Sequence, residues 1–250
     1  EAYELNQKKS NRIIGGMIWL KMETLNVGTA IDLSDLGLDA VEETETEFRI
    51  GAMTTLRTLE THEGLAAYTN GAMRESVRHI VGVQLRNLAT LGGSLYSRFG
   101  FSDVLTMFLA LDTWVELYKG GCIPLAEFAR QKPNRDILVR LIVKKEKAVF
   151  DYQSVRNSQT DFPVLTCCVS LIGNEARTVI GARPARAMVV EDQEDILGNF
   201  DQKSEEAKKE VIQKFADYAA EHVPTSGNMR GSKEYRTLLV KVLTRRAWEV

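Results

Sequence analysis

The chain has 250 residues, of which 44% are hydrophobic and 26% are charged, a composition typical of a globular protein and unlike that of a disordered or fibrous one. The 32 lysines and arginines nearly balance the 34 aspartates and glutamates, and the formal charge of -2 argues against binding to nucleic acid. No run approaches the roughly 20 apolar residues of a membrane helix, and residues 1–11 do not resemble a signal peptide. We therefore expect a cytoplasmic protein without membrane association.

Cysteine and histidine are too sparse to indicate a metal centre. Cys122, Cys167 and Cys168 are too few and too unevenly spaced for a disulfide framework, a four-thiolate zinc site or an iron–sulfur cluster. The histidines add no ligand pattern, and the common hydrolase, zinc-protease and phosphate-loop motifs are absent from the sequence. Redox chemistry in this chain would therefore need an organic cofactor.

The first half of the chain predicts short strands mixed with amphipathic helices. Ser102 is well placed to cap a helix, because its side chain can accept the free N–H groups of the first turn. The polar run 144–147 is interpreted as a surface boundary between two domains. After the short apolar run 12–14, we expect in chain order strands at 30–33 and 48–52, a short helix capped by Thr54 and ending at Glu60, helices at 73–80 and 103–111, and strands at 113–118 and 137–143.

The second half predicts an antiparallel meander followed by two helices. Strands are expected at 149–155, 163–172 and 176–181, and Gly173-Asn174 suits a tight turn with positive φ between the last two. Ser204 and Ser232 then each begin an amphipathic helix. Because each helix has one apolar face, we expect both to cover a face of the sheet.

Two glycine pairs could bring the backbone close to a phosphate. Gly15-Gly16 follows an apolar run, and Gly92-Gly93 lies between Thr90 and Ser94, whose hydroxyls can add hydrogen bonds. A side chain at Gly93 would block this approach and resist the positive φ expected there. Ordinary tight turns explain each pair equally well. Neither pair forms a G-x-G-x-x-G motif, so a Rossmann-type nicotinamide site gains no support.

The run Gln84–Leu95 (QLRNLATLGGSL), followed by Ser102-Asp103, resembles the signature of the flavin-binding subunit of molybdenum hydroxylases. This family includes xanthine dehydrogenases, carbon monoxide dehydrogenase medium subunits and nicotinate-type dehydrogenases. Because further similarities occur in the family's order, the resemblance extends along nearly the whole chain. They are found at 14–16, 50–56, 156–162 and 230–236.

The resemblance implies an α+β fold in two parts. Residues 1–147 would form an FAD-binding domain of the vanillyl-alcohol-oxidase type, with FAD extended between two lobes. Residues 148–250 would form a C-terminal domain of the CO dehydrogenase flavoprotein type, in which helices pack on a three-stranded antiparallel sheet. Since the chain begins inside what resembles the family's first helix, the family's leading strand is expected to be missing.

The same resemblance implies that both glycine loops bind the diphosphate and ribityl parts of FAD, mainly through backbone N–H groups. FAD should be non-covalent, because neither loop holds a histidine or cysteine to which a flavin could be linked. Asp103 could accept hydrogen bonds from cofactor hydroxyls or could simply face the dipole of its own helix. The expected FAD-contacting residues are Ile13, Ile14, Gly15, Gly16, Met17, Ile18, Trp19, Ile80, Ala89, Thr90, Gly92, Gly93, Ser94, Asp103 and Leu138.

The sequence also departs from the family pattern. Residues 17–19 supply no hydroxyl or carboxylate after the first glycine pair, which predicts weaker diphosphate binding. Arg98 could pair with a phosphate, but we expect it to point to water, as most arginines do. Gln153 or Ser154 replaces a basic residue that relatives often carry, which puts contact with the edge of the flavin ring in question.

The leading functional hypothesis is an electron-transfer flavoprotein subunit. By resemblance, substrate is hydroxylated at a molybdenum cofactor on one partner subunit, electrons pass through iron–sulfur clusters on a partner, and FAD hands them to NAD or another acceptor. Tyr96, Phe99 and Phe101 are the candidate docking region for the iron–sulfur subunit, although they could equally fill the space between the flavin lobes. The alternatives are a non-catalytic interaction subunit that has lost FAD and a stand-alone flavin oxidase.

Overall fold

The computed structural model of the chain describes residues 1–249. Its strands are β1 (Arg12–Ile14), β2 (Ala30–Asp32), β3 (Val41–Glu43), β4 (Glu47–Gly51), β5 (Thr113–Leu117), β6 (Gly121–Pro124), β7 (Leu138–Lys144), β8 (Ala148–Arg156), β9 (Pro163–Ile172), β10 (Glu175–Gly181) and β11 (Met188–Val189). Its helices are α1 (Ala2–Asn6), α2 (Leu56–Thr61), α3 (Glu63–Tyr68), α4 (Ala72–Arg78), α5 (Val83–Arg86), α6 (Leu91–Tyr96), α7 (Asp103–Ala110), α8 (Leu125–Arg130), α9 (Glu205–His222) and α10 (Lys233–Trp248). No helix within these residues is both long and apolar enough to cross a membrane.

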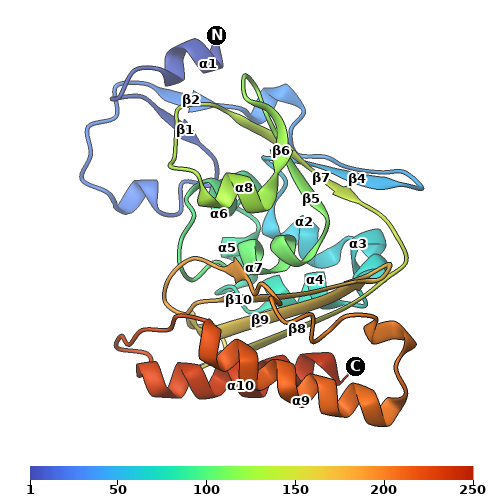
Figure 1. Cartoon of the computed structure of the whole chain (residues 1–250). Coiled ribbons are helices and arrows are strands. Elements are labelled where there is room, and N and C mark those ends of the chain that lie inside the picture. The colour runs from blue at the N-terminus through green and yellow to red at the C-terminus, as the bar shows by residue number, and fades with distance from the viewer. Residues whose placement is uncertain (250) are drawn as a thin grey trace.

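The elements form successive layers (Figure 1). An antiparallel five-stranded sheet has the order β3-β4-β7-β5-β6, and an antiparallel four-stranded sheet has the order β11-β10-β9-β8. A layer of helices that includes α4 and α7 lies between these two sheets, and α9 and α10 cover the outer face of the second. The parallel pair β1-β2 forms a small lobe of its own at the N-terminal end.

Helices on both faces explain why β9 is buried along almost its whole length. Cys168 faces the core that contains α4 and α7, whereas Cys167 and Val169 face the core formed with α9 and α10. Because both faces are covered, the strand reads as a continuous apolar run rather than as an alternating one. The sheet therefore holds two hydrophobic cores together, and its position fixes α7.

Most elements expected from the sequence are present, with shifts at their ends. Ser102, Ser204 and Ser232 cap their helices as predicted, and Gly173 has a positive φ of 57° in the expected turn. The prediction that Thr54 caps a helix was wrong, because the cap is Thr55, whose hydroxyl accepts the Thr58 N–H. The short β11 adds a fourth strand to the three predicted for the second sheet. The expected domain boundary at 147/148 falls between β7 and β8 and stays a prediction.

Arg135 anchors the N-terminal lobe to the loop before β7. Its Nη2 donates to the carbonyl oxygens of Lys8 (2.6 Å) and Asn11 (2.9 Å), and Asn6 Nδ2 donates back to the Arg135 carbonyl (2.9 Å). These bonds join α1 and the start of β1 to a segment more than 120 residues later in the chain. One wall of the cleft described below is thereby held against the other.

Arg236 is the largest fully buried side chain and ties α10 to its surroundings. Its guanidinium donates to the carbonyls of Val164 (2.9 Å) and Ser226 (2.9 Å), to the carbonyl of Gly231 and to Asn228 Oδ1 (2.7 Å). Burial lowers the pKa of Arg236, because removing the charged guanidinium from water costs free energy. The four oxygen acceptors offset part of that cost. The motif at 230–236 thus stabilises the C-terminal part of the chain.

Replacing Arg236 with methionine should lower the free energy of unfolding by about 3 to 5 kcal/mol, because several buried acceptors would lose their donor. Urea titration followed by circular dichroism measures the effect. The matched control is Arg245→Met on the exposed side of the same helix, which should change stability by less than about 0.5 kcal/mol. A loss below about 1 kcal/mol for Arg236→Met would contradict this role.

Candidate functional site

A cleft of about 970 Å³ runs from the β1-β2 lobe to the junction of α7 with β8. Its lining is mainly apolar, with a few polar groups, as is usual for cofactor sites. The cleft brings together every residue expected to contact FAD, although actual contact stays a prediction. These residues are Ile13, Ile14, Gly15, Gly16, Met17, Ile18, Trp19, Ile80, Ala89, Thr90, Gly92, Gly93, Ser94, Asp103 and Leu138.

The first glycine loop offers free hydrogen-bond donors to the cleft. Within residues 1–249, the backbone N–H groups of Gly15, Gly16 and Met17 have no acceptor. Gly16 is also packed against the second loop so closely that a Cβ there would lie 1.8 Å from the Leu88 carbonyl oxygen. The loop therefore needs glycine for its close packing, and its unpaired N–H groups suit an anionic group such as a diphosphate.

The second glycine pair lies in a helix rather than in an open loop. Gly92 and Gly93 occupy the first turn of α6, so the expectation of a positive φ at Gly93 was wrong. The N–H groups here already have acceptors: Gly92 donates to the Ala52 carbonyl (2.7 Å), and Gly93 donates to Thr90 Oγ1 (3.2 Å). A Cβ on Gly92 would lie 2.8 Å from the Ala52 carbonyl oxygen. This pair thus shapes the cleft floor, and free donors come from the first loop.

Two residues that depart from the family pattern, Met17 and Arg98, lie in different environments in the structure. Met17 is 48% exposed with a positive φ of 53°, so its side chain adds no polar group to the loop. The prediction that Arg98 points to water was wrong, because Arg98 is buried over the Phe128 ring, 4.0 Å from its centroid. Its Nε and Nη1 donate to the carbonyls of Phe128 (3.2 Å) and Tyr96 (2.8 Å). Arg98 is therefore a packing residue and does not line the cleft.

An aromatic cluster lines part of the cleft. Phe99 and Phe101 stack with centroids 5.0 Å apart, and Phe101 contacts Phe162 at 4.3 Å. Trp19, from the first loop, contacts both phenylalanines at 5.3 and 5.8 Å. Tyr96 lies apart from this cluster, beside Phe128, and donates to the Asn134 carbonyl. The cluster connects the first glycine loop to the segment after β8, and its docking role stays a prediction.

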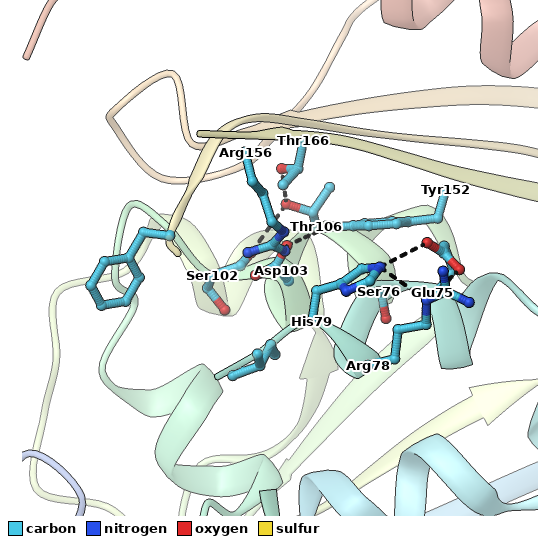
Figure 2. Close-up of polar contacts among 12 residues, drawn as sticks. Glu75, Ser76, Arg78, His79, Ser102, Asp103, Thr106, Tyr152, Arg156 and Thr166 are labelled. Atoms are coloured by element: carbon cyan, nitrogen blue, oxygen red, sulfur yellow. Dashed lines mark hydrogen bonds and ion pairs between the residues drawn. The ribbon is translucent and has the colours of Figure 1, made fainter. Parts of the chain in front are cut away.

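A buried polar group lines the cleft close to this cluster, where α7 meets β8 (Figure 2). Asp103 Oδ1 accepts hydrogen bonds from Tyr152 Oη (2.6 Å) and from Arg156 Nη2. The side chains of Asp103 and Arg156 are only 5% and 6% exposed. Arg156 Nη1 also donates to the Asp161 carbonyl (2.7 Å), while its Nε has no partner within residues 1–249.

Burial dominates the electrostatics of this group. It raises the pKa of Asp103 to about 6, against the opposing effects of Arg156 and Tyr152. Burial also raises the pKa of Tyr152 well above its ordinary value, and the neighbouring Asp103 carboxylate adds to that shift. The Tyr152 hydroxyl therefore stays protonated and acts as a donor. Asp103 thus has two donors from the protein itself, beyond the helix-dipole role considered from the sequence.

Sequence reasoning did not identify Arg156 and Tyr152 as site residues. Arg156 was noted only as part of a resemblance, and Tyr152 stands in a strand where a buried tyrosine is unremarkable. The signal that could have found them is the unusual buried carboxylate Asp103, which needs partners from elsewhere in the chain. Those partners come from β8, about 50 residues later in the chain, so the sequence around Asp103 could not predict which residues they are.

The raised pKa of Asp103 predicts a specific pH dependence of stability. At about pH 3 this carboxyl is mostly protonated in both folded and unfolded chains, and at about pH 7 it is mostly ionised in both, so folding then carries the full cost of burying its charge. Relative to Asp103→Asn, the wild-type free energy of unfolding should therefore fall by about 3 kcal/mol between pH 3 and pH 7. Urea titrations at several pH values measure this difference. A difference that is constant with pH would refute the assignment.

Comparison with known proteins places the chain in a family. Residues 1–145 match the model described as "FAD binding domain in molybdopterin dehydrogenase", and residues 150–250 match the "CO dehydrogenase flavoprotein C-terminal domain". The nicotine 6-hydroxylase medium subunit of Paenarthrobacter nicotinovorans is 24% identical over 260 residues, covering 97% of this chain and 90% of that protein. The protein YgfM of Escherichia coli K12 is 27% identical over 166 residues, 66% of this chain and 62% of YgfM. The chain thus matches about three fifths of the length of YgfM.

Solved structures agree with this assignment at the level of fold. A chain of the carbon monoxide dehydrogenase from Hydrogenophaga pseudoflava superposes with a TM-score of 0.87 at 20% identity, covering 99% of this chain and 92% of that one. A chain of quinoline 2-oxidoreductase from Pseudomonas putida 86 gives a TM-score of 0.84 at 18% identity, with the same coverage. The α+β fold implied by the sequence is thereby confirmed. The FAD-binding family model matches more than half of the residues of this chain. The chain therefore belongs to the FAD-binding family of molybdopterin dehydrogenases, with a C-terminal domain of the CO dehydrogenase flavoprotein type.

Proposed function

We propose that this chain is the flavoprotein subunit of a multi-subunit molybdenum hydroxylase. In this proposal it receives electrons from iron–sulfur clusters of a partner subunit, whose substrate is hydroxylated at a molybdenum cofactor on another chain, and passes them to NAD or another acceptor. The observation that carries it is the cleft of about 970 Å³ with unpaired N–H groups at Gly15, Gly16 and Met17, in a chain that has an FAD-binding domain. The relatives' names as medium subunits support a multi-subunit assembly.

The residues that line the cleft fit FAD in both shape and chemistry. The N–H groups of the first loop would hold the diphosphate, and α6, packed closely against Ala52 through Gly92, would form the floor beneath it. Apolar side chains such as Ile80 and Leu138 suit the flat ring. FAD supplies the ability to accept and release electrons, so this chain need not provide an acid or base.

The protein's own contribution at the ring end is electrostatic and steric. Arg156 brings a buried positive charge to the cleft wall, and Asp103 neutralises part of it. Because the site is largely apolar, such charges act more strongly than they would in water. The aromatic cluster of Trp19, Phe99, Phe101 and Phe162 limits the access of water close to this pair. Binding, orientation and exclusion of water are thus the roles assigned to this chain.

We predict that Gly16→Ala weakens FAD binding by about tenfold or more, which corresponds to about 1.4 kcal/mol, because the new Cβ would displace the first loop from the Leu88 carbonyl. Flavin absorbance per chain and titration of the FAD-free chain measure the effect. The matched control is Gly227→Ala, where the nearest atom to a Cβ is 3.5 Å away and binding should not change. Equal affinity in both variants would remove the first loop from the site.

A wild-type chain that binds no FAD would favour the alternative of an interaction subunit that kept the fold and lost the cofactor. The exposed apolar side chain of Met17 in the first loop is the observation that motivates this alternative. Co-purification from the native host, with mass spectrometry of the attached chains, tests the proposed partners in either case. Oxidase turnover without partners would instead favour a stand-alone flavin enzyme.

We also predict that FAD is held non-covalently, because the glycine loops contain no histidine or cysteine and every cysteine lies outside the cleft lining. Precipitation with acid should release the yellow colour into the supernatant. The supernatant absorbance near 450 nm, compared with that of the redissolved pellet, measures the released fraction. Colour that stays in the pellet would show a covalent linkage and would overturn this prediction.

A further inference from the structure

A second cavity, of about 640 Å³, lies beside the FAD cleft and shares Arg156 with it. It is formed by α4, the end of β8 and the residues that follow β8. Its volume is in the range of sites that bind small molecules. Unlike the FAD cleft, it is lined mostly by polar and charged side chains, among them Arg74, Glu75, Arg78, Asp151, Gln153 and Arg156. The FAD assignment leaves this cavity unexplained.

The cationic side of this cavity has unused hydrogen-bond donors. Arg78 uses its Nε on Glu75 (3.1 Å) and on His79 (3.0 Å), and no other bond from its guanidinium is formed within residues 1–249. The exposed Arg74 forms no ion pair with any of these residues. Since burial and the nearby Arg78 lower the pKa of His79, this histidine is neutral and accepts from Arg78. Two guanidinium groups on one helix are thus available to an anion.

Arg156 adds a buried donor to the same cavity. Its side chain is 6% exposed, and its Nε is buried without a hydrogen-bond partner in the part of the chain that the structure describes. The Asp103 carboxylate occupies Nη2 and the Asp161 carbonyl occupies Nη1, so the guanidinium is held firmly in place. Arg156 is therefore a pre-organised group rather than a mobile surface arginine.

The β8 side of the cavity supplies an acceptor. Asp151 lies there and is engaged only by Gln153 Nε2 (2.7 Å) among the residues described, whereas Glu75 lies on α4 and pairs with Arg78. A carboxylate in such a wall accepts hydrogen bonds from hydroxyl groups and repels a second anion. The cavity thus favours a ligand with one anionic end and hydroxyls elsewhere over a polyanion.

We propose that this cavity binds a small hydroxylated organic anion, whose single phosphate or carboxylate group lies against Arg156, Arg78 and Arg74 and whose hydroxyls face Asp151. The geometry of the cavity and the unpaired guanidinium donors carry this assignment, and it does not depend on FAD. The ligand would share only the Arg156 wall with the FAD cleft.

Calorimetric titration of the full chain tests the proposal with three probes: glycerol 3-phosphate, malate and uncharged glycerol. Saturable binding of at least one anion, with no binding of glycerol, is the expected result, and the better of the two anions identifies the group that is recognised. The variant Arg74→Gln/Arg78→Gln should weaken that binding by about tenfold. The matched control is Arg245→Gln/Arg246→Gln, which removes two exposed arginines from α10 and should leave affinity within about twofold.

Each titration is run with and without saturating FAD, because a phosphate could also enter the diphosphate loop. Binding that persists with FAD and weakens in the α4 variant supports the second cavity. If the chain binds no FAD, the same loss in the α4 variant still supports it, so this proposal and the proposed function fail separately. The assignment is overturned if neither anion binds, if glycerol binds as well as the anions, if FAD abolishes binding, or if both double variants weaken it equally.

Discussion

Burial of the Asp103 carboxylate is the constraint on which the arrangement of the site depends. A buried charge at the start of α7 needs donors, and β8 supplies them as Tyr152 and Arg156. Satisfying this one group therefore pins the end of β8 to α7. Because Arg156 also holds the Asp161 carbonyl, the segment after β8 is fixed, and Phe162 is placed against Phe101 in the aromatic cluster. The position of this part of the cleft wall thus follows from one carboxylate.

The two glycine pairs act through different physical effects, although the sequence presents them as equivalent. In the first, close approach to Leu88 requires Gly16, and the neighbouring N–H groups remain free. In the second, helix α6 and the segment before α2 consume the N–H groups, and glycine is needed at position 92 because the Ala52 carbonyl lies so near. One pair therefore supplies donors, and the other supplies space. Because the N–H groups of Gly92 and Gly93 already have acceptors, this pair has fewer backbone donors for FAD than the sequence led us to expect.

The sequence predicted the parts of the fold that local pattern determines. Serine caps located α7, α9 and α10, and apolar runs located β8, β9 and β10. Short helices such as α6 were missed because a few residues carry too little periodicity, and glycines in α6 suggested a loop. The environment of Arg98 depends on the Phe128 ring, 30 residues later, so its burial followed from tertiary packing. The cleft residues were identified by resemblance, whereas Arg156 required the structure.

The shared position of Arg156 gives the two cavities a physical means of communication. An anion near this guanidinium in the second cavity would reduce the positive potential felt in the FAD cleft, since charges a few ångströms apart interact by a few kcal/mol at the effective dielectric of a protein interior. Asp103 already offsets part of the same charge, so a second anion would compete with it for the guanidinium. Linkage then requires reciprocity: whatever an anion does to the affinity for FAD, FAD must do to the affinity for the anion. Because Arg156 lines both cavities, the Asp103–Arg156 pair and the strand that carries Arg156 form the most direct physical link between them.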